Sequence, residues 1–327
     1  MTPLLRRNLG LDLARVTEST AIQAGRWMGL GQQNRVKIAA TEAMINALQG
    51  IDMNGRIISE VGTQPLPSGS LVGNGSGPEM DVVLGPIDGA SLLVNGRSGA
   101  ISAIAVAQRG SMGALHPARY MEKLVVDREV AHALVKEAMD APAAWTLAMI
   151  ARIKQKRVRD LVVFVLDRPR HQALIEEIRQ AGARVALRRA GDIAGAMLAA
   201  IPDSGIDVLM GIGGAPEGLM AACAVKALRG AMLTRLAPQS EAERQQVQAA
   251  GLDCRRIINQ DEMVRSEQVF FAATGITDGM LLDGVHYTGD MATTHSIVLR
   301  VQTGVRRMIR AERRLEDLFV GEIAYRG

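Results

Sequence analysis

The segment LVVFVLDRPRHQALIEEIRQAGARVALRRAGDIAGAMLAAI, residues 161–201, decides the fold class. Its two short apolar runs, LVVFVL and ARVALRR, each precede a stretch that carries apolar residues at helical spacing. The pattern repeats in IDVLMGIGG, residues 206–214, which is followed by PEGLMAACAVKAL. Strand–helix units of this length predict a doubly wound, mostly parallel sheet for the C-terminal half of an α/β protein.

The N-terminal half has a different rhythm and predicts an α+β region. Two amphipathic helices are expected over 11–29 and 35–49. Short strands are expected over 56–61, 80–85, 100–107, 269–275 and 296–302, and a loop over 62–77. The charged end VRRMIRAERRLEDL, residues 305–318, has the composition of a solvated helix. These changes in pattern suggest domains over 1–156 and 157–300, and a charged C-terminal tail over 301–327.

Composition narrows the class of protein. The 327 residues are 48% hydrophobic but only 3% aromatic, which suits buried strands covered by closely packed helices. The net charge of +4 comes from scattered arginines, so the sequence predicts no nucleic-acid partner. Two cysteines exclude a disulfide framework. Without a signal peptide or a membrane-length apolar run, we expect a cytoplasmic protein that does not bind membranes.

Charged side chains follow several of the predicted strands. The carboxylates are Glu60, Asp88, Asp192 and Glu217, and the arginines are Arg168 and Arg170. Ligands of open α/β sheets bind beyond the carboxyl ends of the strands. Carboxylates favour Mg²⁺ or Mn²⁺, and guanidinium groups favour phosphate, so this set indicates a metal and phosphate site. For Asp192 and Glu217, which lie in first helical turns, helix capping is an alternative.

The glycine-rich stretch GIGGAPEG, residues 211–218, matches no nucleotide motif well. Pro216 stands where the dinucleotide fingerprint has glycine, and the Lys-Ser/Thr end of a Walker loop is absent. The stretch could still hold a phosphate by its backbone N–H groups at a helix N-terminus. The five histidines lack metal spacing, and a structural role is expected for them.

Several stretches together resemble the class II fructose-1,6-bisphosphatases, the GlpX family, over nearly the whole chain. The matching stretches are RVTEST (15–20), GRWMGLG (25–31), GPIDGA (85–90), RYMEKLVV (119–126), RPRH (168–171), GDIA (191–194), IPDS (201–204), GIGGAPEG (211–218) and FAATGIT (271–277). The resemblance implies a layered αβαβα sugar-phosphatase fold. It also implies metal-dependent hydrolysis of fructose 1,6-bisphosphate in gluconeogenesis, with Mg²⁺ or Mn²⁺ as the cofactor. The implied partner is a sugar bisphosphate or sugar phosphate, and a homo-oligomer is a further option.

The resemblance also implies roles for individual residues. Glu60, Asp88 and Glu217 match metal ligands, and Glu60 and Asp88 also match catalytic positions. The substrate-binding matches are Gly89, Tyr120, Arg168, Arg170, Gly191 and Asp192.

The chain departs from the family pattern at metal-site positions. An aspartate ligand of the family is Gln32 here, and a second is Gly85. A second acid after Glu60 is Gly62, and a threonine near the attacking water is Ala90. Loss of these groups predicts weak or absent phosphatase activity, since even outer-shell changes cost roughly 10- to 100-fold in metal affinity or activity.

Three hypotheses follow for the function of the chain. The first is a phosphatase with a rearranged or single-metal site. The second is a catalytically silent paralogue that binds sugar phosphate as a sensor or partner subunit. The third is a phosphatase for another phosphorylated metabolite, such as an inositol or nucleotide phosphate.

Overall fold

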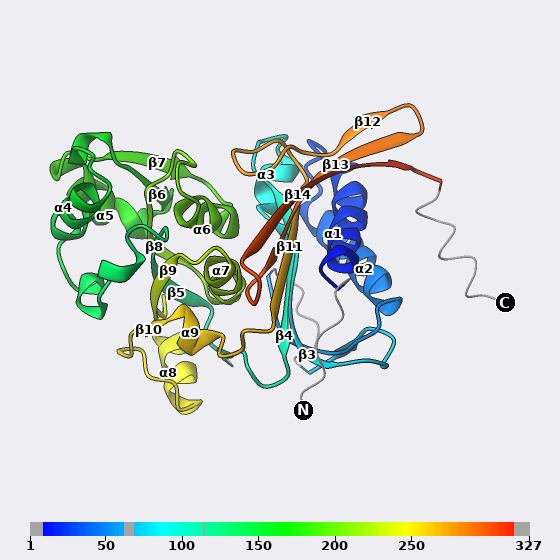
Figure 1. Ribbon diagram of the computed structural model, residues 1–327, viewed down its shortest axis with the longest axis horizontal. Helices are drawn as coiled ribbons and strands as arrows, with labels where there is room; N and C mark the ends of the chain where they lie inside the picture. The colour runs from blue at the N-terminus through cyan, green and yellow to red at the C-terminus, as the bar shows by residue number, and fades with distance from the viewer. Residues whose placement is uncertain (1–8, 62–68, 114, 317–327) are drawn as a thin grey trace.

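The computed structural model describes residues 9–61, 69–113 and 115–316. Its elements stack in five layers (Figure 1), with one sheet on each side of a central pair of helices. The outer helices on one side are α1 (Leu9–Gly25) and α2 (Gln33–Gln49), the central pair is α6 (Asp192–Ala200) and α7 (Ala215–Ala227), and the outer helices on the other side are α4 (Ala143–Ile153) and α5 (Gln172–Gln180). The expected layered αβαβα fold is thus confirmed.

The first sheet has eight strands and is almost entirely antiparallel. Its order is β12 (His286–Thr288), β13 (Met291–Arg300), β11 (Val269–Gly275), β4 (Ile101–Gln108), β3 (Glu79–Asp88), β1 (Asn54–Glu60) and β2 (Leu71–Val72), with β14 (Val305–Arg314) also paired to β13. Only β1 and β3 run parallel. The carboxyl ends of these two strands therefore meet at one edge, where Glu60 and Asp88 lie.

The second sheet has six strands and is mixed. Its order is β10 (Ile258–Asn259), β9 (Ala231–Leu236), β5 (Tyr120–Val126), β8 (Val208–Gly214), β6 (Val162–Leu166) and β7 (Arg184–Arg188). The strand–helix run produces the parallel part, β8-β6-β7. The rest is antiparallel, because β5 lies between β8 and β9 and runs opposite to both, and β10 is antiparallel to β9.

Shorter elements complete the chain. The remaining helices are α3 (Ala90–Val94), α8 (Glu241–Ala249) and α9 (Gln260–Met263), and the 3-10 turns are η1 (Ala131–Ala133), η2 (Lys136–Met139), η3 (Val158–Asp160) and η4 (Pro169–His171). The loop expected over 62–77 lies partly outside the described residues, and its described part contains β2.

The C-terminal segment is a strand, so the expectation of a solvated helix was wrong. All ten residues of β14 pair with β13. Gly304 turns the chain between the two strands with a φ of 61°. On the face toward α1, Ile309 packs against the apolar core and Arg313 pairs with the buried Glu18. Cross-strand pairing thus overrides a local composition that favours helix.

The two sheets do not divide the chain at residue 156. β5 joins the second sheet although it precedes that point, and β11 to β14 return to the first sheet. A single apolar core fills the space between the sheets, where small side chains of α6 and α7 let the layers approach closely. The chain therefore crosses between the sheets several times.

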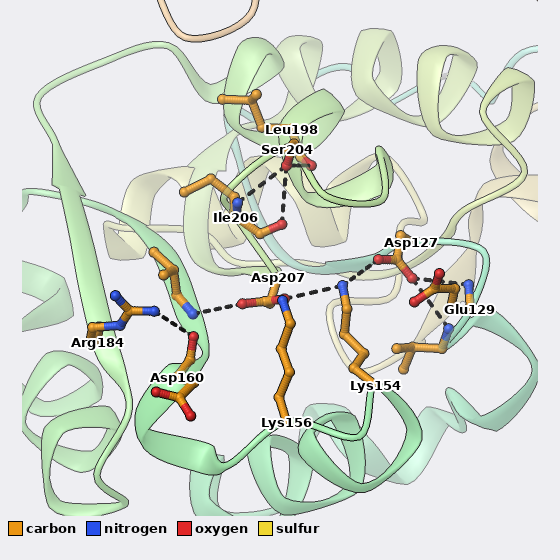
Figure 2. Close-up of polar contacts among 12 residues, drawn as sticks. Asp127, Glu129, Lys154, Lys156, Asp160, Arg184, Leu198, Ser204, Ile206 and Asp207 are labelled. Atoms are coloured by element: carbon orange, nitrogen blue, oxygen red, sulfur yellow. Dashed lines mark hydrogen bonds and ion pairs between the residues drawn. The ribbon is translucent and has the colours of Figure 1, made fainter.

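One end of the second sheet holds a group of alternating charges, which we call the rear ion cluster: the side chains of Asp127, Lys154 and Asp207 are buried, and that of Lys156 reaches the surface (Figure 2). Lys154 Nζ lies 2.5 Å from Asp127 and 3.1 Å from Asp207, and Lys156 Nζ lies 2.7 Å from Asp207. Asp127 follows β5 and Asp207 precedes β8, and these strands are antiparallel. The cluster therefore lies at one end of this strand pair, and Tyr120 and Gly214 lie at the other.

Along the described part of the chain, no helix combines the length and apolar character needed to cross a membrane.

Candidate active site

Asp88 closes β3 beside an irregularity in its pairing with β4. Gly85 pairs with Ala103 and Asp88 with Ile101, so the register shifts between them. Gly89 follows with a φ of 88°, a conformation that favours glycine, and turns the chain into α3. Asp88 is buried, and its Oδ2 accepts a hydrogen bond from the Ile193 amide at 3.0 Å. The end of the first sheet is thereby joined to the first turn of α6.

Asp192 begins α6 directly after Gly191, whose φ is 91°. Its carboxylate forms an ion pair with Lys123, which reaches it from the middle of β5. The side chain of Lys123 is 1% exposed. Since a buried ammonium group needs a partner, Asp192 does more here than complement a helix N-terminus.

Glu217 lies in the first turn of α7, after β8 ends at Gly214. Its carboxylate lies against the backbone of Gly214, where a Cβ would collide with Oε2. At Gly213, a Cβ would collide with both the Asp192 carboxylate and Lys123 Nζ. The two glycines are thus needed so that charged side chains can pack against bare backbone.

Asp88, Asp192 and Glu217 form what we call the acid cluster, and their charges interact. Burial, followed by the charges of Glu217 and Asp192, raises the pKa of Asp88 to about 7. Burial, followed by the charge of Asp192, also raises the pKa of Glu217. Lys123 opposes both shifts. One ammonium group therefore faces three carboxylates, and the cluster carries excess negative charge.

Arg170 lies beside the acid cluster, in η4 after β6. Its guanidinium lies over the Tyr120 ring, 5.2 Å from the ring centroid, and its Nη2 donates to the Ile212 carbonyl at 2.8 Å. Burial lowers the pKa of Arg170, and the charge of Asp192 opposes this shift. The structure thus brings Tyr120, Arg170 and Asp192 together. Arg168, two residues earlier, donates to the Asp167 carbonyl at 2.9 Å.

His171 supports this arrangement as a structural histidine. Its Nδ1 lies 2.6 Å from the Leu166 carbonyl, and the Ile212 amide donates to its Nε2 at 2.8 Å. These two contacts place the proton on Nδ1. Burial lowers the pKa of His171, which favours this neutral form.

Three of the substituted family positions are described, and the fourth, Gly62, lies outside the described residues. Gln32 is exposed at the start of α2, and its Oε1 accepts a hydrogen bond from Arg35 at 3.1 Å. At Gly85, a Cβ would meet the Ala103 carbonyl at 3.1 Å and Met220 Cε at 3.3 Å. Ala90 is buried at the start of α3. None of these three positions offers a side chain that binds cations strongly.

Glu60 ends β1 and pairs in register with Leu84, one residue before Gly85. The backbone therefore places it on the strand next to the acid cluster, and its side chain is outside the described part of the structure. Within that part, no group of three or more histidine, cysteine, aspartate or glutamate side chains could hold a metal ion. A metal site that uses Asp88 and Glu217 thus needs a further ligand.

Sequence reasoning overlooked Lys123 as a site residue. The signal was present in YMEKLVV, because Met121, Lys123 and Val125 alternate onto the same buried face of β5. A lysine at such a position requires a carboxylate partner. Glycine is also required at Gly213 and Gly214, because charged side chains pack against their backbone. The motif GIGGAPEG does not show these contacts.

Comparison with known proteins shows which protein family the chain belongs to. A family model described as bacterial fructose-1,6-bisphosphatase, glpX-encoded, matches residues 7–313. The fructose-1,6-bisphosphatase class 2 of Haemophilus influenzae is 36% identical, covering 96% of this chain and 98% of the relative. The fructose-1,6-bisphosphatase 1 class 2 of Escherichia coli is 35% identical, covering 94% and 95%. The chain therefore belongs to the GlpX family of class II fructose-1,6-bisphosphatases.

Proposed function

We propose that this chain hydrolyses the 1-phosphate of fructose 1,6-bisphosphate, giving fructose 6-phosphate and phosphate as a step of gluconeogenesis, at a rate well below that of an ordinary enzyme. The observation that carries the proposal is the position of the Arg170 guanidinium beside Asp192, a buried carboxylate of the acid cluster. A guanidinium group binds phosphate oxygens, and carboxylates bind the divalent cation that the family requires.

For the cofactor, the charges of the acid cluster fit one divalent cation better than two. Asp88 and Glu217 offer oxygen ligands, and burial together with neighbouring carboxylate charges raises the pKa of each. We propose that they hold one Mg²⁺ or Mn²⁺ together with Glu60. Such an ion neutralises phosphate oxygens and makes a water molecule more acidic. Gln32 and Gly85 leave too few carboxylates for a second ion.

The protein's own groups have separate proposed roles. Arg170 and Arg168 bind phosphate, and Tyr120 supports Arg170 through its ring. Asp192 accepts a hydrogen bond from a sugar hydroxyl, while Gly89 and Gly191 let the backbone approach the substrate.

Asp88 accepts a proton from the attacking water. This role is the one that the match of Asp88 to a catalytic position of the family implies. Glu60 lies on the neighbouring strand and assists it in the proposed mechanism.

The low rate follows from the substituted positions. Ala90 supplies no hydroxyl group to orient water, and Gly85 supplies no ligand. Removal of one such group from a catalytic unit typically removes most of its activity. Sugar phosphates are charged and do not cross membranes freely, so we place this activity in the cytoplasm.

A second candidate is a silent sugar-phosphate-binding paralogue. The specific observation in its favour is the crowding at Gly85, where the Ala103 carbonyl and Met220 fill the space next to an absent ligand. In such a protein the Arg170 side of the site would still bind sugar phosphate as a sensor or as a subunit of an active enzyme.

One experiment separates the two candidates. Phosphate release from fructose 1,6-bisphosphate is measured with Mg²⁺ and with Mn²⁺, and fructose 6-phosphate binding is measured by calorimetry. Slow hydrolysis that Asp88→Asn abolishes supports the phosphatase. Binding without hydrolysis supports the silent paralogue. Turnover above roughly 1 s⁻¹, within the ordinary enzyme range, would contradict the predicted loss of rate.

A further inference from the structure

Lys123 is a buried charge in the middle of an apolar strand face. Its neighbours on that face, Met121 and Val125, are fully buried, and its own side chain is 1% exposed. The ammonium group contacts the Asp192 carboxylate and lies 3.5 Å from the Gly214 carbonyl. A charge this deep in the protein persists only when its partner is fixed.

The three carboxylates of the acid cluster do not share this ammonium group equally. Asp192 is paired with Lys123 directly. Asp88 instead accepts a hydrogen bond from the Ile193 amide, and Glu217 accepts one from its own helix N-terminus. One acid thus has a cation of the protein as its partner, and two acids have only backbone amides.

The backbone beneath the ion pair is shaped to admit it. A Cβ on Gly213 would collide with the Asp192 carboxylate and with Lys123 Nζ. A Cβ on Gly218 would collide with Met121 Sδ, beside the Lys123 stem, whose Cδ would lie 3.6 Å away. Two glycines of GIGGAPEG therefore make room for the lysine strand and its partner.

We infer that Lys123 is a positioning residue that assigns the three carboxylates to two tasks. It holds Asp192 on the sugar side of the site and keeps it from the divalent cation, which leaves Asp88 and Glu217 as the ligands. The inference rests on the proposed function, since it assumes one cation site and one sugar-phosphate site.

The test is direct Mn²⁺ binding, measured by the electron paramagnetic resonance signal of the free ion, on the parent, two single variants, their double variant and a control variant. Lys123→Met keeps an unbranched apolar stem, one atom shorter, and removes the charge, so Asp192 becomes available and Mn²⁺ affinity should rise by roughly 10- to 100-fold. Asp192→Asn leaves the ammonium group to Asp88 and Glu217, so Mn²⁺ affinity should fall below that of the parent. The double variant restores the parent's net charge and should bind Mn²⁺ about as well as the parent.

Fructose 6-phosphate binding, measured by calorimetry without metal, gives the second readout. Lys123→Met should weaken it by about tenfold, because Asp192 is no longer held in place. The double variant should bind no worse than Asp192→Asn alone, since both changes remove the same interaction. Lys156→Met is the control. It removes a lysine of the rear ion cluster whose side chain is 37% exposed, so the fold should persist and neither affinity should change.

The order of Mn²⁺ affinities decides the inference. A Lys123→Met protein that binds Mn²⁺ no better than the parent overturns it, since a lysine with a packing role alone would give that result. If Lys123→Met does not fold, Asp192→Asn decides, and unchanged or higher Mn²⁺ affinity overturns the inference.

Failure of the proposed function gives a different result. A parent that neither binds Mn²⁺ nor hydrolyses the bisphosphate would refute that function. Lys123→Met should even then gain a Mn²⁺ site that the double variant lacks, and no gain would overturn the inference as well.

Discussion

The rear ion cluster and the acid cluster lie at opposite ends of the same strand pair, β5 and β8, and their charges are balanced differently. The rear cluster pairs two carboxylates with two ammonium groups (Figure 2). The acid cluster sets three carboxylates against one paired ammonium group, that of Lys123, with Arg170 beside Asp192. The same pair of strands thus carries a cluster with balanced charges at one end and a cluster with more carboxylates than ammonium groups at the other.

The pKa of a carboxylate is lowered in the rear cluster, at Asp207, and raised in the acid cluster, at Asp88. Burial would raise the pKa of Asp207, but hydrogen bonds from Lys156, the Val162 amide and Lys154 outweigh it and lower that pKa. Burial would lower the pKa of Lys154, and its bonds to Asp127 and Asp207 raise it instead. In the acid cluster the pKa of Asp88 rises to about 7. The ion pairs of the rear cluster therefore stabilise the charged form of Asp207. In the acid cluster the charged form of Asp88 is destabilised, and perturbed pKa values of this kind are typical of a functional site.

The largest expected effect is the loss of the rear cluster's central lysine. Lys154→Met would leave Asp127 and Asp207 buried with only Lys156, so we expect a loss of about 3–5 kcal/mol in the free energy of unfolding. Urea denaturation measures it. Lys156→Met is the matched control, because that side chain is 37% exposed and should cost less than about 1 kcal/mol. Equal losses for the two variants would show that burial does not set the strength of this cluster.

The second effect is on ligand binding at the acid cluster. Arg170→Ala removes the guanidinium that faces Asp192, so we expect fructose 6-phosphate affinity to fall by about 1.5–3 kcal/mol, the range for hydrogen bonds to charged groups. Calorimetry measures the affinity, and Arg15→Ala, an exposed arginine paired with Asp12, is the control. Unchanged binding in Arg170→Ala would remove the phosphate role from this side of the site.

A smaller effect on the free energy of unfolding is expected from Asp88→Asn, and its sign is opposite to that expected for Lys154→Met. Between about pH 4 and pH 7 the folded protein binds a proton on Asp88 that the unfolded chain has lost, so this group's contribution makes the fold less stable as pH rises through that window. Asp88→Asn should therefore raise the metal-free stability at pH 8 by on the order of 1–2 kcal/mol.

Thermal melts between pH 5 and pH 8 test this prediction. The parent should lose stability toward pH 8 more steeply than Asp88→Asn. Asp207→Asn in the rear cluster should instead lower the melting temperature at pH 8, because the pKa of Asp207 is shifted downward. If Asp88→Asn and Asp207→Asn shift the melting temperature at pH 8 in the same direction, the two clusters do not differ in how their carboxylates affect stability.

The smallest effect is expected from restoring the family's metal-site residues. Gln32→Asp, Gly85→Asp and Ala90→Thr together should return measurable Mn²⁺-dependent hydrolysis, and each change alone should do little, since residues of one catalytic unit are non-additive. Gly85 is not at positive φ, but a Cβ there meets the Ala103 carbonyl at 3.1 Å, which limits the gain.

Mn²⁺ should raise the melting temperature of the triple variant more than that of the parent, because added ligands strengthen binding to the folded state. A folded triple variant with neither phosphate release nor Mn²⁺ stabilisation would show that the excess charge of the acid cluster no longer serves a metal.

Local patterns in the sequence were enough to predict most of the helices and strands. The helical spacing over 11–29 and 35–49 corresponds to α1 and α2, and the strand–helix run from residue 161 gives the parallel part of the second sheet. These predictions succeed because apolar periodicity reflects which face of an element is buried. The resemblance in the motifs likewise indicated the family.

Long-range pairing was beyond such patterns. β14 is a strand because all of its residues pair with β13, and β5 belongs to the second sheet because β8 and β9 flank it. Neither partner is visible from the local composition of the segment. The strand–helix rhythm therefore predicted the parallel part of the second sheet, and the layered fold was implied by the family resemblance.

The order of residues along the chain shows which charged residues are present and which strand ends they follow. Folding brings four of them close enough for their charges to interact: Asp88 from one sheet, Asp192 and Glu217 from the central helices, and Lys123 from the other sheet. The physical reason is that charge balance depends on distance and burial in three dimensions, and neighbours in space are here about 25 to 130 residues apart in the chain.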